Sequence, residues 1–174
     1  MLKKLFSTGL AALAGILLLV PASEARTLDE IIKAGVIRVG VQPNLPGNSV
    51  LKPDGSWEGM DIEMGEAIAK SLGVKAEFVP SKSPQRVPIL VSDQADIMLG
   101  GLTRNARRAK LIDYSLPTFT ESQVVLTTSK RADLKSWKDF NRSDITLANV
   151  RGSVPAQWTR KNAPKAKEIL FDSG

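Results

Sequence analysis

The sequence contains neither cysteine nor histidine. The chain therefore has no thiol nucleophile, no histidine-based catalytic triad, no disulfide and none of the usual zinc ligand sets. Any chemistry must depend on carboxyl, hydroxyl, phenol, amine or guanidinium groups. We expect no metal and no cofactor, and we expect the core to supply the stability that disulfides give to many exported proteins.

Aromatic residues are also scarce, with five Phe, three Trp and one Tyr in the chain. They do not cluster among the cationic residues, although the formal net charge is +6. Proteins that bind single-stranded nucleic acid interleave aromatic rings with positive charge, so we expect no nucleic-acid partner. The charge indicates at most a mild attraction to anionic solutes or to a membrane surface.

The only long apolar run lies near the start of the chain, over 10–20, after Lys3 and Lys4 and before small residues that end at Ala25. This order is typical of a secretory signal peptide, and the run is shorter than the roughly 20 residues that cross a bilayer. We predict a cleaved signal peptide over 1–25 and a periplasmic protein without a lipid anchor, since lipidation needs a cysteine. An uncleaved membrane anchor is the alternative.

Helical and strand patterns alternate after the signal peptide. The spacing predicts a helix from Thr27 to Gly35, a strand over 36–41, an irregular loop over 42–59, a helix over 61–72, a strand over 75–80, a short helix, and a strand over 96–99. This order indicates an α/β fold with a parallel sheet covered by helices. Such sheets bind ligands beyond the carboxyl ends of their strands, where the loop after Val41 should meet Gly100 and Gly101.

A second set of elements repeats that order. The sequence predicts a strand over 122–129, a helix over 132–140, a strand over 145–150, a helix after Ser153 and a last strand from Lys167. Because this set stops early, we expect the chain to be part of a longer protein. We predict two lobes with mostly parallel sheets flanked by helices: lobe 1 over 26–122, then a crossing strand and an incomplete lobe 2 over 123–174.

Candidate binding residues follow the strand over 96–99. Gly101 lets a ligand approach the backbone, and Thr103 adds a hydroxyl. Asn105 is a favoured N-cap, so the helix after it should present free amides. Arg108, in its first turn, has the planar donor fork that binds a carboxylate. The alternative is that Arg108 pairs with Asp113 or reaches solvent.

Two more positions are candidates elsewhere in the chain. Ser153 should cap a helix and would add a hydroxyl from the second lobe. Arg86 starts a short helix, and an inward Arg86 beside Arg108 would favour an acidic or polar ligand; a solvated surface arginine is the alternative. We expect the remaining cations of this basic stretch to stay on the surface: Arg104, Arg107 and Lys110.

The order of these segments resembles the periplasmic solute-binding proteins of polar amino-acid ABC importers. The resemblance is carried by GMDIEMGEAIAKSLGV (59–74), LTRNARRAKLIDYS (102–115) and LANVRGS (147–153). It implies a periplasmic binding protein type II-like fold and a monomer that closes on one amino acid and delivers it to an inner-membrane ABC permease, without catalysis.

The resemblance also implies roles for individual residues. Thr103 and Arg108 match the positions that hold the ligand α-carboxylate, Gly101 matches a backbone contact, and Ser153 matches a hydroxyl of the second lobe. The family's first loop usually carries an aromatic ring, but here it offers Leu45 and two candidate polar contacts, Asn44 and Asn48. The missing ring argues against a basic ligand. The family's acidic acceptor for the ligand ammonium lies beyond residue 174, so we expect weak binding by this chain alone.

Two other functions stay open. The same fold resembles periplasmic cyclohexadienyl dehydratases, which eliminate water and carbon dioxide from prephenate-like acids and use an acidic residue as general acid. A carboxylate-binding Arg108 would serve that reaction as well as transport. The third possibility is a sensor module of a larger receptor or of a peptidoglycan-cleaving protein.

Overall fold

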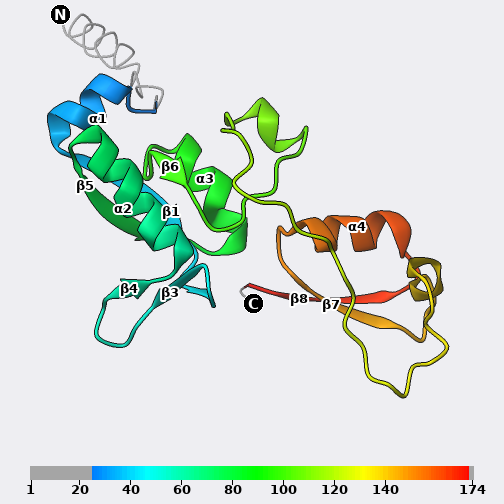
Figure 1. Ribbon diagram of the computed structural model, residues 1–174. Helices are drawn as coiled ribbons and strands as arrows, with labels where there is room; N and C mark the ends of the chain where they lie inside the picture. The colour runs from blue at the N-terminus through cyan, green and yellow to red at the C-terminus, as the bar shows by residue number, and fades with distance from the viewer. Residues whose placement is uncertain (1–24, 173–174) are drawn as a thin grey trace, which may run out of the picture.

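The computed structural model describes residues 25–172, so the predicted signal peptide lies outside the described residues except for Ala25. These residues form two α/β units joined by an extended segment (Figure 1). Within this described range, no helix is long and apolar enough to cross a membrane.

The first unit is built on a parallel sheet in the order β5-β1-β6. Its elements are α1 (Leu28–Ala34), β1 (Val36–Val41), α2 (Met60–Leu72), β5 (Lys75–Pro80), the 3-10 turn η1 (Ser83–Gln85), α3 (Arg86–Val91) and β6 (Ile97–Met98). Thr27 begins α1 with a capping box, and Gly35 ends it in the left-handed conformation at φ 70°. These observations confirm the predicted parallel sheet and its helices, although β6 is shorter than the predicted strand.

The segment over 42–59 is more ordered than the predicted irregular loop. It contains β2 (Asn44–Leu45), β3 (Ser49–Leu51) and β4 (Trp57–Glu58), paired antiparallel in that order. Tight turns bring the short strands together, as when Gly55 N–H donates to the Lys52 carbonyl at 2.9 Å. The many Pro and Gly residues that suggested a loop form these turns instead.

Gly59 joins this small sheet to α2 and has φ 121°, a region that is essentially restricted to glycine. A β-carbon there would collide with the backbone carbonyl oxygen of Asn48, which accepts a hydrogen bond from Asp61 N–H at 2.8 Å. We expect Gly59→Ala to lower the free energy of unfolding by about 3 kcal/mol. The matched control is Gly55→Ala, because Gly55 also has positive φ but has open space around it; it should cost about 1 kcal/mol. Equal losses in urea denaturation would contradict this interpretation.

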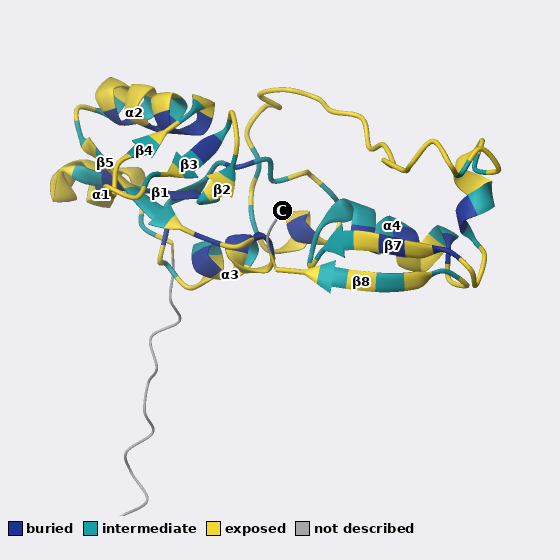
Figure 2. Cartoon of the chain, turned by 90° about the horizontal axis from the view of Figure 1, so that it is seen from below, coloured by how far each residue is buried: buried dark blue, intermediate teal, exposed yellow. Residues whose placement is uncertain are grey.

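The main core lies between the first sheet and its helices, and its buried residues belong to α1, β1 and α2 (Figure 2). Its buried members are Ile31, Ile37, Val39, Val41, Ile62 and Ala69. The three residues from β1 alternate along the strand and therefore lie on one face of the sheet, where each is 2% exposed or less. This core fixes the carboxyl end of β1 and therefore one wall of the site described below.

The second unit contains η3 (Trp137–Phe140), β7 (Thr146–Val150), α4 (Val154–Asn162) and β8 (Lys167–Phe171). β7 and β8 pair in parallel, and a smaller buried cluster lies under them. Ser153 is the N-cap of α4, since its side chain accepts from Ala156 N–H at 3.2 Å. The predicted strands over 145–150 and from Lys167, and the helix after Ser153, are confirmed.

Two predicted elements of the linking region are wrong. Residues 122–129 pair with no strand among the described residues and are exposed, with Val124 78% and Leu126 92% accessible (Figure 2). A β-rich sequence becomes a strand only where a neighbour accepts its hydrogen bonds. The predicted helix over 132–140 is reduced to the four-residue 3-10 helix η3. The boundary between the predicted lobes, at 122/123, stays a prediction.

Candidate ligand-binding site

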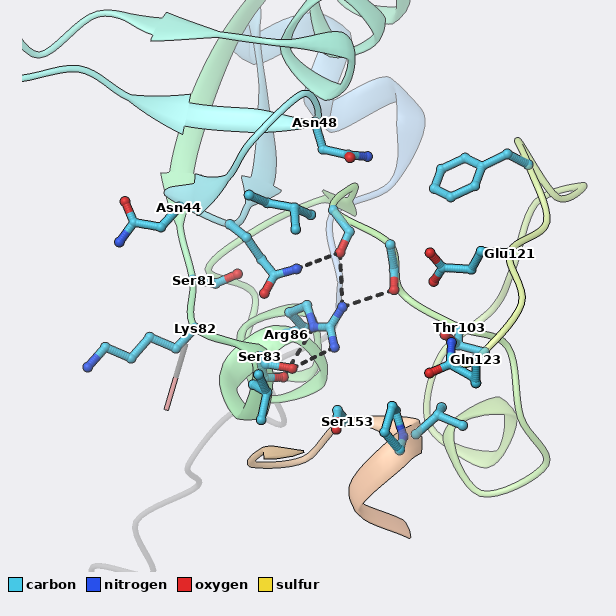
Figure 3. A pocket seen from close by; sticks show the side chains of 18 of the residues that line it. Asn44, Asn48, Ser81, Lys82, Ser83, Arg86, Thr103, Glu121, Gln123 and Ser153 are labelled. Atoms are coloured by element: carbon cyan, nitrogen blue, oxygen red, sulfur yellow. Dashed lines mark hydrogen bonds between the residues drawn. The ribbon is translucent and has the colours of Figure 1, made fainter. Parts of the chain in front are cut away.

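A cavity of about 500 Å³ lies where the two units meet (Figure 3). It is lined by residues that follow β1, β5, β6 and β7, and by part of the linking segment. Gln42, after β1, donates through its side-chain amide to the Gly100 carbonyl at 2.9 Å. The predicted meeting of these two strand ends is confirmed.

All seven candidate residues line this cavity: Asn44, Asn48, Arg86, Gly101, Thr103, Arg108 and Ser153. Their roles as ligand contacts stay a prediction. The three cations expected on the surface, Arg104, Arg107 and Lys110, are exposed. Arg104 lies over the ring of Tyr114, 5.9 Å from its centroid.

The side chain of Arg108 is buried and connects the two units. Its Nη1 donates to the Thr103 carbonyl at 2.8 Å, and its Nη2 donates to the Gly152 carbonyl at 3.1 Å. The predicted alternative, a pair with Asp113, is not formed within residues 25–172. Because a guanidinium has five N–H donors and these bonds use two, three donors stay uncommitted within the described part of the chain.

The backbone around Arg108 differs from the prediction. Instead of an α-helix with free N-terminal amides, the chain forms the three-residue 3-10 helix η2 (Arg108–Lys110). The Arg108 N–H already donates to the Asn105 side-chain oxygen at 2.9 Å, so this amide is not free for a ligand. The candidates for anion recognition here are the Arg108 guanidinium and Thr103, whose hydroxyl has no hydrogen-bond partner among the described residues.

Arg86 is 5% exposed, so its alternative as a solvated surface residue is wrong. Its guanidinium donates to the carbonyl and hydroxyl of Ser83, at 3.1 and 2.7 Å, and to the carbonyls of Gly100 and Gly101, at 2.9 and 3.1 Å (Figure 3). Burial, with the nearby charge of Arg108, lowers the pKa of Arg86 to about 10, so it stays cationic at neutral pH. These four bonds use most of its donors, and Arg86 holds the cavity wall in place.

The two glycines that Arg86 holds are in the left-handed region, with φ 87° for Gly100 and 64° for Gly101. This conformation turns both carbonyl groups toward one guanidinium, and glycine adopts it without strain. Asp61, near the same wall, is 3% exposed, and burial raises the pKa of its carboxyl, although the nearby Gly100 backbone and Asn48 side chain act in the opposite direction. Its Oδ2 has no partner among the described residues.

Ser153 faces the cavity from the second unit. Its oxygen accepts the capping bond from Ala156, which leaves its hydroxyl hydrogen available to a ligand. The preceding Gly152 has φ 74°, and a β-carbon there would lie 3.1 Å from Cα of Pro84 in the first unit. A larger residue at position 152 would therefore press the two units apart at the cavity mouth.

The sequence interpretation missed part of the cavity lining, which comes from the linking segment: Phe119, Glu121 and Gln123. The only signal for them was their spacing of two residues, which places side chains on one face of an extended chain. Phe119 supplies an aromatic ring to a cavity whose first loop has none. A missing aromatic ring therefore no longer disfavours a basic ligand.

Within residues 25–172 no group of three or more acidic residues could hold a metal ion. The cavity offers an arginine with free donors, hydroxyl groups, side-chain amides, one carboxylate and one ring. Hydrogen bonds and charge at these groups suit a small polar solute that carries a carboxylate.

Comparison with known proteins agrees with this geometry. A family model described as bacterial extracellular solute-binding proteins, family 3, matches residues 37–171. The chain is 31% identical over 151 residues to a glutamine-binding protein of Geobacillus stearothermophilus, covering 84% of this chain and 57% of that protein. It is 27% identical over 163 residues to a cyclohexadienyl dehydratase of Pseudomonas aeruginosa, covering 91% and 61%. The chain thus spans about three fifths of the length of these relatives.

Among solved structures, the chain resembles the ancestral amino acid-binding protein AncCDT-1, which is described as a precursor of cyclohexadienyl dehydratase. The TM-score is 0.79 at 37% identity, and the match covers 85% of this chain and 66% of that one. The α/β fold with parallel sheets is therefore the type II periplasmic binding protein fold, as predicted.

Proposed function

The chain belongs to the bacterial extracellular solute-binding proteins, family 3, which include amino-acid-binding proteins, and on that basis we propose that it captures one amino acid between its two units. A polar or acidic amino acid is the proposed ligand. We further propose that the protein is exported by a cleaved signal peptide, acts as a periplasmic monomer and delivers the solute to an inner-membrane ABC permease.

The observation that carries this proposal is Arg108, which is buried beside the cavity and keeps three uncommitted donors. A ligand α-carboxylate would accept from this guanidinium and from the Thr103 hydroxyl, while Ser153 would donate from the second unit. Such a carboxylate would contact both units at once. Binding would therefore favour their closed arrangement, which a permease could recognise.

The charges that line the cavity bear on the ligand side chain. Lys82, Arg86 and Arg108 are cationic and Glu121 is the only acidic residue among the lining residues. A net positive cavity favours neutral or acidic side chains and disfavours basic ones. The amides of Asn44 and Asn48 would hydrogen-bond a polar side chain.

Isothermal titration of the full-length natural protein that carries this chain, against the twenty amino acids, tests the proposal. We expect the tightest binding for a polar or acidic amino acid. Tight binding of lysine or arginine would exclude the proposed side-chain class, and failure of all twenty to bind would overturn the function itself.

A second candidate function is favoured by the likeness to a cyclohexadienyl dehydratase. A carboxylate-binding Arg108 would also hold a prephenate-like acid. Incubation of the purified protein with prephenate distinguishes the two, since dehydration and decarboxylation would give an ultraviolet-absorbing aromatic product. We expect no such product.

A further inference from the structure

The second unit meets the first at Gly152, the residue before the Ser153 cap. The Gly152 carbonyl accepts from Arg108 Nη2 at 3.1 Å. A β-carbon added to Gly152 would lie 3.1 Å from Cα, 3.4 Å from Cβ and 3.6 Å from the backbone nitrogen of Pro84. Residue 152 is therefore close to two separate parts of the first unit, a guanidinium and a backbone segment.

Hydrogen bonds fix the part of the first unit that contains Pro84. Pro84 lies in η1, and the preceding Ser83 accepts from the Arg86 guanidinium through its carbonyl at 3.1 Å and its hydroxyl at 2.7 Å. Arg86 also donates to the Gly100 carbonyl at 2.9 Å, which ties η1 to the residues after β6. Figure 3 shows this cluster above Ser153 of the second unit. A surface held in this way has little freedom to yield to a side chain from the second unit.

The fit at Gly152 leaves no room for a β-carbon without a shift. At 3.1 Å from a backbone atom, an added β-carbon would require a movement of a few tenths of an ångström. Because Pro84 is fixed, the movement would carry residue 152 away from the first unit, and Ser153 would move with it. The bond from Arg108 to the Gly152 carbonyl is already 3.1 Å long, so the same movement would take it beyond the usual range.

We propose that Gly152 is a positioning residue that sets how closely the two units approach, and that its lack of a β-carbon raises affinity for every amino acid that the cavity binds. This inference rests on the proposed function, in which Arg108 and Ser153 contact the ligand from opposite units. Gly152 is not among the cavity-lining residues, so it acts through those two residues. A β-carbon at position 152 would disfavour the closed arrangement, and the apparent affinity would fall with the fraction of molecules that can close.

The test is Gly152→Asn in the full-length natural protein. Gly152 has φ 74°, and Asn enters this left-handed region more readily than most residues, so the change adds a β-carbon with little backbone strain. Isothermal titration with each amino acid that the wild type binds should show about tenfold weaker binding. This is the lower end of what one hydrogen bond to a charged group contributes.

Gly73→Asn is the matched control. Gly73 ends α2 at φ 70°, a β-carbon there would meet nothing within 4 Å, and the residue does not line the cavity. The control therefore has the same backbone demand without the contact between units. It should bind with wild-type affinity.

Kinetics distinguishes a positioning role from a loss of folded protein. The β-carbon at position 152 destabilises the closed complex, so stopped-flow measurements should show the weaker binding mainly as faster dissociation. The factor should be the same for each amino acid, because residue 152 does not contact the ligand side chain. A smaller folded fraction would instead lower the binding stoichiometry at unchanged Kd, and that result would overturn the inference.

The remaining outcomes separate this inference from the proposed function. Equal affinities for Gly152→Asn and Gly73→Asn would show that residue 152 does not control closure. A loss confined to some amino acids would mean that it contacts the ligand side chain, which also contradicts the inference. In both cases amino-acid binding by the wild type still stands. If the wild type binds no amino acid, the proposed function fails and this inference fails with it.

Discussion

Arg108→Ala is expected to weaken amino-acid binding at least about a hundredfold. The substitution removes a cavity-lining guanidinium that has three donors uncommitted among residues 25–172, together with its bonds to the carbonyls of Thr103 and Gly152. A hydrogen bond to a charged group contributes about 1.5–3 kcal/mol, so two bonds to one carboxylate account for a loss of this size. Isothermal titration with the tightest-binding amino acid measures it.

Two variants control for charge and geometry at this position. Arg107→Ala removes the adjacent arginine, which is exposed and does not line the cavity, and should leave affinity within about twofold of wild type. Arg108→Lys keeps the charge but loses the planar fork, so it should recover only part of the affinity. If Arg108→Ala binds as tightly as Arg107→Ala, the guanidinium is not the carboxylate contact.

The largest effect on stability is expected for Asp96→Asn. The Asp96 side chain is 1% exposed, and Asp96 immediately precedes β6. Its carboxylate accepts from Arg38 N–H at 2.6 Å, from Arg38 Nη2 at 2.7 Å and from Arg26 Nε at 2.8 Å. Asp96→Asn removes the buried negative charge that Arg26 and Arg38 share. We expect the free energy of unfolding to fall by about 3–5 kcal/mol. Asp113→Asn changes an exposed carboxylate that forms no ion pair within the described part of the chain, and it should change urea stability by less than about 0.5 kcal/mol.

Asp96 also predicts how stability depends on pH. Burial alone would raise the pKa of this carboxyl, but hydrogen bonds from Arg26 and Arg38 outweigh burial and hold the pKa well below its ordinary value. The ionised Asp96 carboxylate therefore contributes fully to stability above the pKa that this carboxyl has in the unfolded chain, about 3.9. That contribution is lost as the pH falls toward the lower pKa of the carboxyl in the folded protein. Wild-type stability should fall steeply below about pH 4, and Asp96→Asn should fall less steeply. Equal acid slopes for the two proteins would contradict this assignment.

Local signals in the sequence predicted the elements that depend on local chemistry. The capping box at Thr27, the left-handed Gly35 and the serine cap at Ser153 fixed helix ends correctly. The strand over 36–41 was predicted from alternation and β-branched residues. The segment over 122–129 has a similar composition, yet it has no partner strand among the residues that the structure describes, and composition does not specify which strands pair.

The candidate site was predictable because parallel strands end at a common edge. From that rule we predicted that the residues after β1 and those after β6 lie close together, and Arg108 lies beside them as expected. The hydrogen bonds of the Arg86 guanidinium could not be predicted from the sequence, because they depend on how close Gly100 and Gly101 lie to it in the folded chain. It also missed Glu121, because the direction of the linking segment is set by how the two units meet.

A crystal structure of the protein with its bound amino acid tests the central claim most directly. The account predicts a ligand carboxylate about 3 Å from the guanidinium nitrogens of Arg108 and from the Thr103 hydroxyl, with Ser153 closing from the second unit. An amino acid seated elsewhere, or an Arg108 side chain directed away from it, would contradict the account.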